Sequence, residues 1–331
     1  MPTTRLSSQS AATDEEVAVR FIPIPLESLC LDTLVGFDIY IRTASYKEPM
    51  LYRSANLPFT SEAKERLLKN YVARIYIERT DQDKYERYIE DNLDKIIADD
   101  TIESERKSQI VYSSATHLME RLFENPRLGE NIRRGEKMVT NTVDYILRDE
   151  KAFRSLLSVT SYDYYTYTHS VNVCVFSVAL AQRTGITGKS ELHVLGTGAL
   201  LHDIGKSIID KSIIGKKGPL DEEEWVTIKK HPDYGVEMLR ETATAPDECH
   251  VVVKGHHERL DGSGYPEGRK SESIHPYAKV AAIADVFDAL TTKRSYKGAV
   301  GSFAALNIMR SEMSQGIDED LFREFVLLMG A

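Results

Sequence analysis

The chain has 331 residues, of which 42% are hydrophobic and 28% charged, and its formal net charge is −9. This composition is typical of a globular protein and excludes fibrous and disordered classes. Because the balance is acidic and no long Lys/Arg cluster occurs, non-specific binding to DNA is not expected. The length suffices for about two domains of ordinary size.

No membrane-spanning or secretory segment is expected. The longest apolar run, Val171–Ala181, is shorter than the ~20 residues that a transmembrane helix requires. Residues 1–15 lack the basic and apolar pattern of a signal peptide, so a cytoplasmic location is predicted. Cys30, Cys174 and Cys249 form no Cys-x-x-Cys motif and are expected to be core residues rather than disulfides or metal ligands.

The first part of the chain is predicted to be a small α/β domain at residues 16–80, after a disordered tail at residues 1–15. Apolar and alternating runs predict the strands, and Ser/Thr before a helical pattern predicts a cap. The expected elements are extended segments at Val19–Ile24, Phe37–Ile41 and Arg74–Glu78, and a helix capped by Thr60 or Ser61. The domain has no glycine-rich phosphate loop, so a regulatory role is expected, through a protein partner or a homodimer.

The rest of the chain is predicted to be helical, which makes the whole an α+β protein. Apolar residues from Tyr85 to Ile97 recur at helical spacing and begin a connector at residues 81–154. Residues 155–331 are predicted as an all-α bundle. Its expected helices are His169–Arg183, Glu191–Asp203, Asp221–His231, Pro246–Glu258, Pro276–Thr291, Phe303–Met313 and Leu321–Met329.

Histidine and aspartate residues gather at the ends of these predicted helices. The candidate metal ligands are His169, His202, Asp203, His231, His256, His257 and Asp285. Five imidazoles and two carboxylates without sulfur exceed the needs of one tetrahedral zinc ion and suit two divalent ions such as iron or manganese. The remaining histidines, which lack such partners, are expected to have ordinary packing or surface roles: His117, His193, His250 and His275.

A site with two metals predicts hydrolysis of a phosphate ester. A water that bridges two ions would lose a proton near neutral pH and attack phosphorus, while the ions neutralise the phosphate oxygens. Asp203 is expected to bridge the ions. Lys206, one turn after His202, is expected to donate a hydrogen bond or a proton to the phosphate or the leaving group. Asp203 and Lys206 are therefore the predicted catalytic residues.

A loop rich in glycine follows the His256-His257 pair. Its glycines allow close approach of the backbone to a ligand, and Gly264, Tyr265 and Pro266 are candidate contacts to a planar base. A basic cluster after the Asp285 helix comprises Lys293, Arg294 and Lys297. Surface charge and binding of phosphate or guanine are both open for this cluster.

These motifs resemble the HD-GYP family, the HD-superfamily phosphodiesterases that cleave cyclic di-GMP. The similarity covers about residues 155–331 and rests on Tyr167-Thr168-His169-Ser170, His202-Asp203-Ile204-Gly205-Lys206, His231-Pro232, His256-His257-Glu258, Asp261–Pro266 and Asp285–Thr291. The resemblance implies an HD-type helical bundle, metal binding by the seven candidate ligands, catalytic assistance by Lys206, and hydrolysis of cyclic di-GMP to linear pGpG, with GMP left open as a further product. It also implies contacts to the dinucleotide from Gly264, Tyr265, Pro266, Asp288, Arg294 and Lys297.

Two departures from the family pattern bear on the site. Some members carry Glu four residues before the first ligand histidine, where it is associated with a third metal. This chain has Tyr165 there, which favours two ions. The usual Arg-Pro-Tyr is Arg294-Ser295-Tyr296 in this chain, a change that keeps the charge.

Three alternatives to a cyclic di-GMP phosphodiesterase stay open. The first is a catalytically weak domain that binds a cyclic dinucleotide or a protein partner. The second is a phosphodiesterase that prefers cyclic GMP-AMP, and the third is an HD-type phosphohydrolase of mononucleotides. The complete ligand set with Lys206 favours an enzyme, and the Gly264-Tyr265-Pro266 loop disfavours mononucleotides.

Overall fold

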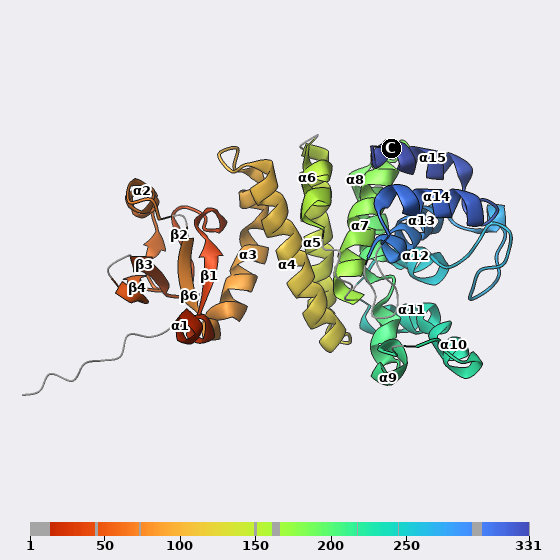
Figure 1. Ribbon diagram of the computed structural model, residues 1–331, viewed down its shortest axis with the longest axis horizontal. Helices are drawn as coiled ribbons and strands as arrows, with labels where there is room; N and C mark the ends of the chain where they lie inside the picture. Colours follow the sequence, from red (N-terminus) through yellow and green to blue (C-terminus); the bar gives the residue numbers. More distant parts are fainter. Residues whose placement is uncertain are drawn as a thin grey trace, which may run out of the picture. The chain divides into compact units, whose positions relative to one another are not determined.

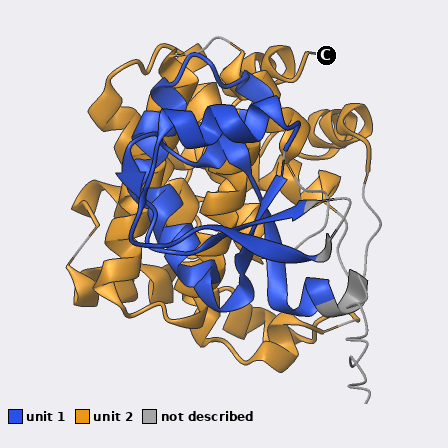
Figure 2. Ribbon diagram, turned by 90° about the vertical axis from the view of Figure 1, so that its left-hand side faces the viewer, with its two compact units in different colours: residues 1–106 blue, residues 107–331 orange. Residues whose placement is uncertain are grey.

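The computed structural model describes residues 14–43, 46–72, 74–148, 151–160, 166–216, 218–243, 245–292 and 300–330. The chain divides into two compact units, residues 1–106 and residues 107–331 (Figure 2). The first unit contains all the strands of the described chain and the second is helical, which confirms the α+β prediction. None of the helices in these described ranges is both long and apolar enough to cross a membrane.

The first unit is built on an antiparallel sheet with the strand order β1-β6-β3-β4. These strands are β1 (Phe21–Pro25), β6 (Arg74–Glu78), β3 (Ile39–Thr43) and β4 (Tyr46–Arg53). Ile24 pairs with Ile75 and Ile22 with Ile77 across the β1–β6 ladder. A second, two-stranded ladder joins β2 (Thr33–Leu34) and β5 (Pro58–Phe59). The predicted strand at Arg74–Glu78 is therefore confirmed, and the one predicted at Phe37–Ile41 begins two residues later.

One segment of the first unit differs from the prediction. The run predicted as extended from Val19 begins inside helix α1 (Asp14–Arg20), and β1 starts only at Phe21. Val19 is 73% exposed, because the helix turns this apolar side chain away from the core. Glu, Ala and Arg before Phe21 are good helix formers, and they outweigh the two valines among them. Of the predicted tail, residues 1–13 lie outside the described part of the chain.

Two helices complete this unit. Helix α2 (Ser61–Lys69) begins at the predicted cap, where the Thr60 side chain accepts a hydrogen bond from the Ala63 amide at 3.3 Å. Helix α3 (Gln82–Ala98), predicted as the start of a connector, contacts the segment between β1 and β3. Its Tyr88 hydroxyl accepts the Cys30 amide at 2.8 Å, and its Tyr88 ring meets Phe37 edge-on. The unit also contains two short 3-10 helices, η1 (Leu26–Ser28) and η2 (Arg79–Asp81).

The second unit consists of helices and the loops that join them, the longest described one lying between α12 and α13 (Figure 1). Its longer helices are α4 (Ser104–Glu124), α5 (Gly129–Arg148), α7 (Thr166–Arg183), α8 (Lys189–Leu201), α11 (His231–Thr242), α13 (Pro276–Thr291), α14 (Ser302–Glu312) and α15 (Glu319–Leu328). Shorter elements are α6 (Ala152–Val159), η3 (Ile204–Ile208), α9 (Lys211–Ile214), α10 (Glu222–Ile228), η4 (Asp247–Cys249), α12 (His250–Gly255) and η5 (Ser271–Ser273).

Helix α7 forms the centre of this unit. All of its residues from Thr168 to Ala181 are buried, and it packs against both α8 and α13. A cluster of three phenylalanine rings ties the middle of α7 to α13 and α15. The ring centre of Phe176 lies 5.6 Å from that of Phe287 and 6.3 Å from that of Phe325. This packing fixes the helix whose first turn carries His169.

One predicted helix of this unit is two helices. The segment expected to run from Asp221 to His231 ends as α10 at Ile228, and His231 begins α11. Pro232 lies in the first turn of α11, where its missing amide hydrogen costs nothing. The break turns the chain at Lys229 and Lys230, so that His231 starts a helix instead of ending one.

Candidate metal centre

The seven predicted ligands come together from five helices: six lie at or beside helix ends, and Asp285 lies within α13. His169 lies in the first turn of α7, His202 caps the C-terminus of α8, and His231 starts α11. His256 caps α12, and Asp285 lies on the buried face of α13. His169, His202, Asp203, His231 and His256 are at most 1% exposed. Ligands far apart in the sequence thus converge because the bundle buries these helix ends together.

A glycine sets the distance between two of these helix ends. A β-carbon on Gly205 would overlap the carbonyl oxygen of His231 and clash with the Gly235 amide. Only glycine therefore allows η3, which follows Asp203, to lie against the first turn of α11. This contact places His231 beside Asp203.

The donors form two groups that share Asp203. Within each group, the ligand atoms lie within 4.8 Å of one another. One group is His169, His202 and Asp203, and the other is Asp203, His231, His256 and His257. Asp203 Oδ2 lies 3.4 Å from His202 Nε2 and 3.7 Å from His169 Nε2, and Oδ1 lies 3.2 Å from His231 Nε2. Each carboxylate oxygen therefore faces one group of imidazoles.

Backbone carbonyls fix the tautomers of three of these imidazoles. His202 Nδ1 donates to the Ala199 carbonyl at 2.7 Å, and His231 Nδ1 donates to that of Ile228 at 2.8 Å. His256 Nδ1 donates to the carbonyl of Val253 at 3.0 Å. A neutral imidazole that donates through Nδ1 carries its lone pair on Nε2. The Nε2 lone pairs of all three rings are therefore available to a metal.

These lone pairs are directed at one another. His202 Nε2 and His169 Nε2 lie 3.3 Å apart, and His231 Nε2 and His256 Nε2 lie 3.2 Å apart. Burial, the largest cause, lowers the pKa of His231 and holds that of His256 well below its usual range, so both rings stay neutral. Asp203 Oδ1 is buried without a hydrogen-bond donor. Facing lone pairs and an unpaired carboxylate oxygen are a donor set that suits cations, and its two groups fit two divalent ions.

Lys206 lies against the shared carboxylate. Its Nζ donates to Asp203 Oδ2 at 2.6 Å, and its side chain is 17% exposed. Although burial raises the pKa of Asp203, the Lys206 charge and the neighbouring imidazoles hold it well below its usual range. Asp203 is therefore an anion and ready to bind metal.

Asp285 spans the two groups from the α13 side. Its Oδ1 lies 3.2 Å from His169 Nε2, and its Oδ2 lies 3.5 Å from His257 Nδ1. Although burial raises the pKa of Asp285, the imidazoles of His169 and His257 beside it hold that pKa well below its usual range. Asp285 is thus placed, like the other six predicted ligands, among the donors.

Asp288 has a different position from the expected contact with substrate. It is 2% exposed and lies behind His169, whose Nδ1 donates to Asp288 Oδ2 at 2.7 Å. Asn172 Nδ2 donates to the other oxygen at 2.7 Å and accepts the Tyr112 hydroxyl at 2.9 Å through its own Oδ1. Asn172 was not singled out from the sequence, although it lies on the same helix, three residues after His169. Asp288 and Asn172 therefore orient the imidazole of His169 from behind.

The Gly264-Tyr265-Pro266 loop lies against His257 and His231. The ring centre of Tyr265 lies 4.5 Å from that of His257 and 6.3 Å from that of His231. The Tyr265 amide donates to the His257 carbonyl at 3.2 Å, and a β-carbon on Gly264 would overlap that same carbonyl. The loop can therefore approach His257 only with glycine before the tyrosine.

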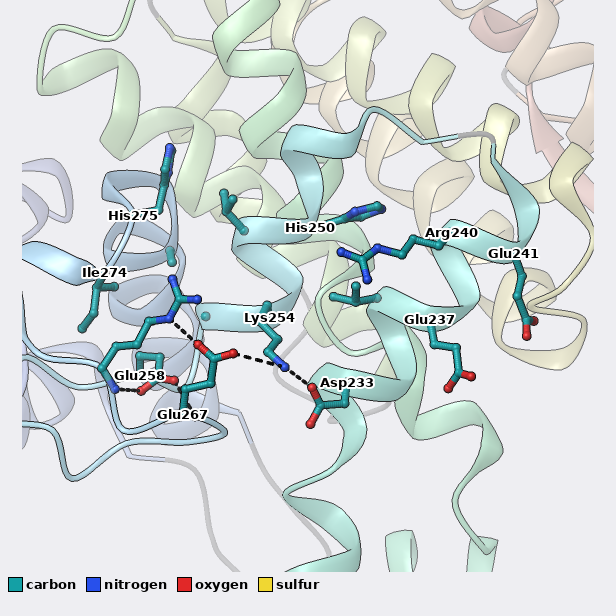
Figure 3. Close-up of a pocket in the computed structure, with 15 residues that line it drawn as sticks. Asp233, Glu237, Arg240, Glu241, His250, Lys254, Glu258, Glu267, Ile274 and His275 are labelled. Atoms are coloured by element: carbon teal, nitrogen blue, oxygen red, sulfur yellow. Dashed lines mark hydrogen bonds and ion pairs between the residues drawn. The ribbon is translucent and has the colours of Figure 1, made fainter.

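Glu258 holds the end of this loop, a role that the sequence alone did not indicate. Its carboxylate is 3% exposed and accepts the backbone amides of Glu267 and Arg269, each at 2.8 Å. Figure 3 shows the same region from a neighbouring cavity of about 730 Å³, where Lys254 forms ion pairs with Asp233 and Glu267. The loop is thus tied to α11 and α12 by its backbone and by charge.

The remaining residues singled out from the sequence lie either outside the described part of the chain or away from the metal donors. Tyr165 and the basic cluster Lys293, Arg294 and Lys297 lie outside the described residues. His193 and His275, expected to have ordinary roles, serve local structure: His193 Nε2 donates to the Glu136 carbonyl at 3.1 Å, and His275 Nδ1 caps α13. Cys174 and Cys249 are buried and Cys30 is half-buried, all as free thiols.

Comparisons with known proteins agree with this geometry. Residues 158–321 match the family model described as HD domain. A cyclic di-GMP phosphodiesterase of Pseudomonas aeruginosa is 33% identical over 227 residues, which cover 68% of this chain and 54% of that protein. A 3'3'-cGAMP-specific phosphodiesterase of Vibrio cholerae is 36% identical over 159 residues, 48% of this chain and 34% of that protein. The chain thus spans about half the length, or less, of these curated relatives.

A solved structure shares the fold. An HDG"Y"P protein from Bdellovibrio bacteriovorus superposes with a TM-score of 0.65 over 94% of this chain and 100% of that one, at 22% sequence identity. Its similarity therefore extends beyond the metal centre to the arrangement of most of the elements. With the HD domain match, the paired histidines and the Gly264-Tyr265-Pro266 loop over them, the chain belongs to the HD-GYP proteins of the HD domain family.

Proposed function

We propose that this protein is a metal-dependent cyclic-dinucleotide phosphodiesterase that hydrolyses cyclic di-GMP to linear pGpG. The observation that carries the proposal is the position of Asp203 between two groups of imidazoles. One carboxylate oxygen faces His202 and the other faces His231. A carboxylate so placed suits a bridge between two divalent ions, with iron and manganese as the candidates.

The residues of the chain have separate tasks in this reaction. When bound, two divalent ions would supply Lewis acidity, which activates water and neutralises charge on the phosphate oxygens. Asp203 and Asp285 provide negative charge to hold the ions, and the neutral imidazoles provide nitrogen donors. Lys206 Nζ, 2.6 Å from Asp203 Oδ2, is in reach of a phosphate beside that carboxylate and donates a hydrogen bond or proton there. Tyr265, stacked near His257, offers an aromatic surface to a base.

The similar proteins support the substrate class. Relatives at 33% to 37% identity are named cyclic di-GMP phosphodiesterases, from Pseudomonas aeruginosa and Xanthomonas campestris. Relatives in Vibrio cholerae at 36% and 41% identity are named 3'3'-cGAMP-specific. Both substrates are cyclic purine dinucleotides, and they differ in one base. Preference for cyclic GMP-AMP is accordingly the second candidate.

The test is product analysis with the metal-loaded protein. Anaerobically purified full-length chain is incubated separately with cyclic di-GMP and with 3'3'-cyclic GMP-AMP, and products are separated by chromatography over time. We expect pGpG from cyclic di-GMP, at a kcat/KM above that for cyclic GMP-AMP. The reverse ratio would move the assignment to the second candidate. Tight binding of cyclic di-GMP without product would instead identify a binding module.

For the first unit we propose a regulatory role, through a protein partner or a homodimer. Its described residues contain no cluster of His, Cys, Asp and Glu that could hold a metal ion. Removal of this unit is expected to alter the rate or oligomeric state and to leave the metal donors of the second unit in place.

A further inference from the structure

A cationic side chain lies between two aromatic rings beside the metal centre. The Nζ of Lys229 is 5.9 Å from the ring centre of Trp225 and 5.7 Å from that of Tyr265. Trp225 lies on α10, and Lys229 caps the C-terminus of that helix. Among the residues that the structure describes, no acidic side chain forms an ion pair with Lys229. The ammonium is therefore held by the two rings and keeps its charge for a ligand.

Tyr265 connects this group to the donors. Its ring is 4.5 Å from His257 and 6.3 Å from His231, both predicted ligands, and its other neighbour is the Lys229 ammonium. Trp225, Lys229 and Tyr265 thus form a row that starts at the metal centre and runs outward along the end of α10. We call this row the aromatic shelf.

Trp225 is 47% exposed, and it is the single tryptophan of the chain. Exposure alone decides nothing, since Val226 on the same helix is 56% exposed. The position of Trp225 is the informative feature. Only the Lys229 ammonium separates its half-exposed indole from the Tyr265 ring, which lies beside His257. Tryptophan offers the largest aromatic face for stacking on a purine, and every base can stack on it.

We infer that the aromatic shelf binds the second nucleotide of a cyclic dinucleotide, with Trp225 stacking on its base and Lys229 contacting its phosphate. This inference rests on the proposed function. A cyclic dinucleotide has two phosphates and two purines, and the metal centre engages one phosphodiester. The other half carries one negative charge and one planar base, which match one free ammonium and one exposed indole. The shelf would therefore select dinucleotides over smaller phosphodiesters.

The kinetic test compares two substrates. The full-length metal-loaded protein is assayed with cyclic di-GMP and with bis(p-nitrophenyl) phosphate, a phosphodiester that lacks a second nucleotide. For Trp225→Ala and for Lys229→Met, we expect the ratio of the two kcat/KM values to fall about tenfold, mainly through KM for cyclic di-GMP. Val226→Ala and Lys230→Met are the matched controls, because they remove an exposed apolar side chain and a charge next to the shelf.

A second measurement is independent of turnover. Since Trp225 is the single tryptophan, its emission reports directly on the shelf. Titration with a non-hydrolysable phosphorothioate analogue of cyclic di-GMP is expected to quench this emission, whereas inorganic phosphate, which lacks a base, leaves it unchanged. In Lys229→Met the analogue should quench only at about tenfold higher concentration.

The outcomes separate this inference from the proposed function. The shelf would be overturned if Trp225→Ala and Lys229→Met left the ratio of the two kcat/KM values unchanged, which includes equal losses on both substrates. It would also be overturned if the Trp225 emission did not respond to the analogue. Absence of cyclic di-GMP hydrolysis by the unmodified protein, with bis(p-nitrophenyl) phosphate still cleaved, counts against the proposed function. In that case quenching by the analogue still supports the shelf, and its absence overturns it.

Discussion

The Nδ1 atom of His169 donates to Asp288 Oδ2 at 2.7 Å, which leaves the Nε2 atom of the same ring 3.2 Å from Asp285 Oδ1. Asp288 therefore fixes both the tautomer and the orientation of the His169 imidazole, and it leaves Nε2 of that ring available to a metal. Partners of this kind raise the basicity of an imidazole and its affinity for metal.

Asp288→Asn is expected to weaken metal binding about 10- to 100-fold, because an amide no longer supplies the negative charge behind His169. Competition with a chromogenic chelator measures this affinity. Asp320→Asn, which changes a carboxylate that is 82% exposed on α15, is the matched control. Equal metal affinity of Asp288→Asn and the unmodified protein would remove Asp288 from the site.

Asp203→Asn is expected to abolish hydrolysis of cyclic di-GMP and to lower the metal content. The unmodified protein should approach about two ions per chain, because each oxygen of Asp203 faces one imidazole group. Plasma mass spectrometry against protein concentration gives the count, and far-ultraviolet circular dichroism checks the helices. A variant that keeps both ions and its rate would contradict the bridging role. A count of three in the unmodified protein would show that Tyr165 does not limit the site to two.

Glu258→Ala is expected to loosen the loop that carries Tyr265. The two amides that Glu258 accepts would lose their partner, at a cost of about 1–3 kcal/mol in the free energy of unfolding. Urea denaturation measures this loss, and the KM for cyclic di-GMP should rise because Tyr265 is less firmly held. Glu272→Ala changes an exposed carboxylate in the neighbouring η5 and serves as the control. Full stability of Glu258→Ala would mean that the loop is held by other contacts.

The metal-free protein is expected to lose stability as the pH falls below about 6.5, the value for an unfolded histidine. Burial lowers the pKa of His256 and His257, with neighbouring imidazoles adding to the effect. Below this pH the unfolded chain binds protons at these histidines that the folded chain does not bind. The free energy of unfolding therefore falls by up to about 1.4 kcal/mol per pH unit for each ring. Urea denaturation at several pH values, with and without bound metal, provides the measurement. A flat profile between about pH 7.5 and 5.5 would be inconsistent with neutral buried imidazoles.

The close approach of the seven candidate donors could be predicted from sequence, because six of them stand at or beside predicted helix ends. Histidine and aspartate stood at predicted helix ends, and the helix Pro276–Thr291 was predicted with the bounds that it has in the structure. The roles of Asp288 and Glu258 could not be predicted, since they depend on which side chains from α7 and the loop lie behind the ligands. A pattern along one helix does not contain that information.

The local errors have local causes. Val19 and Phe21 look alike as apolar residues, yet the chain changes from helix to strand between them, and no glycine or proline marks the change. The break between α10 and α11 falls at Lys229 and Lys230, which are both good helix formers. Pro232 is therefore the nearest residue whose type indicates a helix boundary. At this break the backbone of His231 packs against Gly205, a contact between segments that local sequence does not reveal.

The contact of Phe325 with Phe176 and Phe287 sets a limit on how short an active fragment can be. The family match ends at residue 321, but α15 runs from Glu319 to Leu328 and places Phe325, fully buried, against the helices that carry His169 and Asp285. A fragment cut at the end of the match would expose two phenylalanine rings and free the helices on which the ligands are mounted. A fragment expressed to contain the metal centre therefore has to include residues through Leu328. The border of the sequence match is thus not the border of the unit that folds.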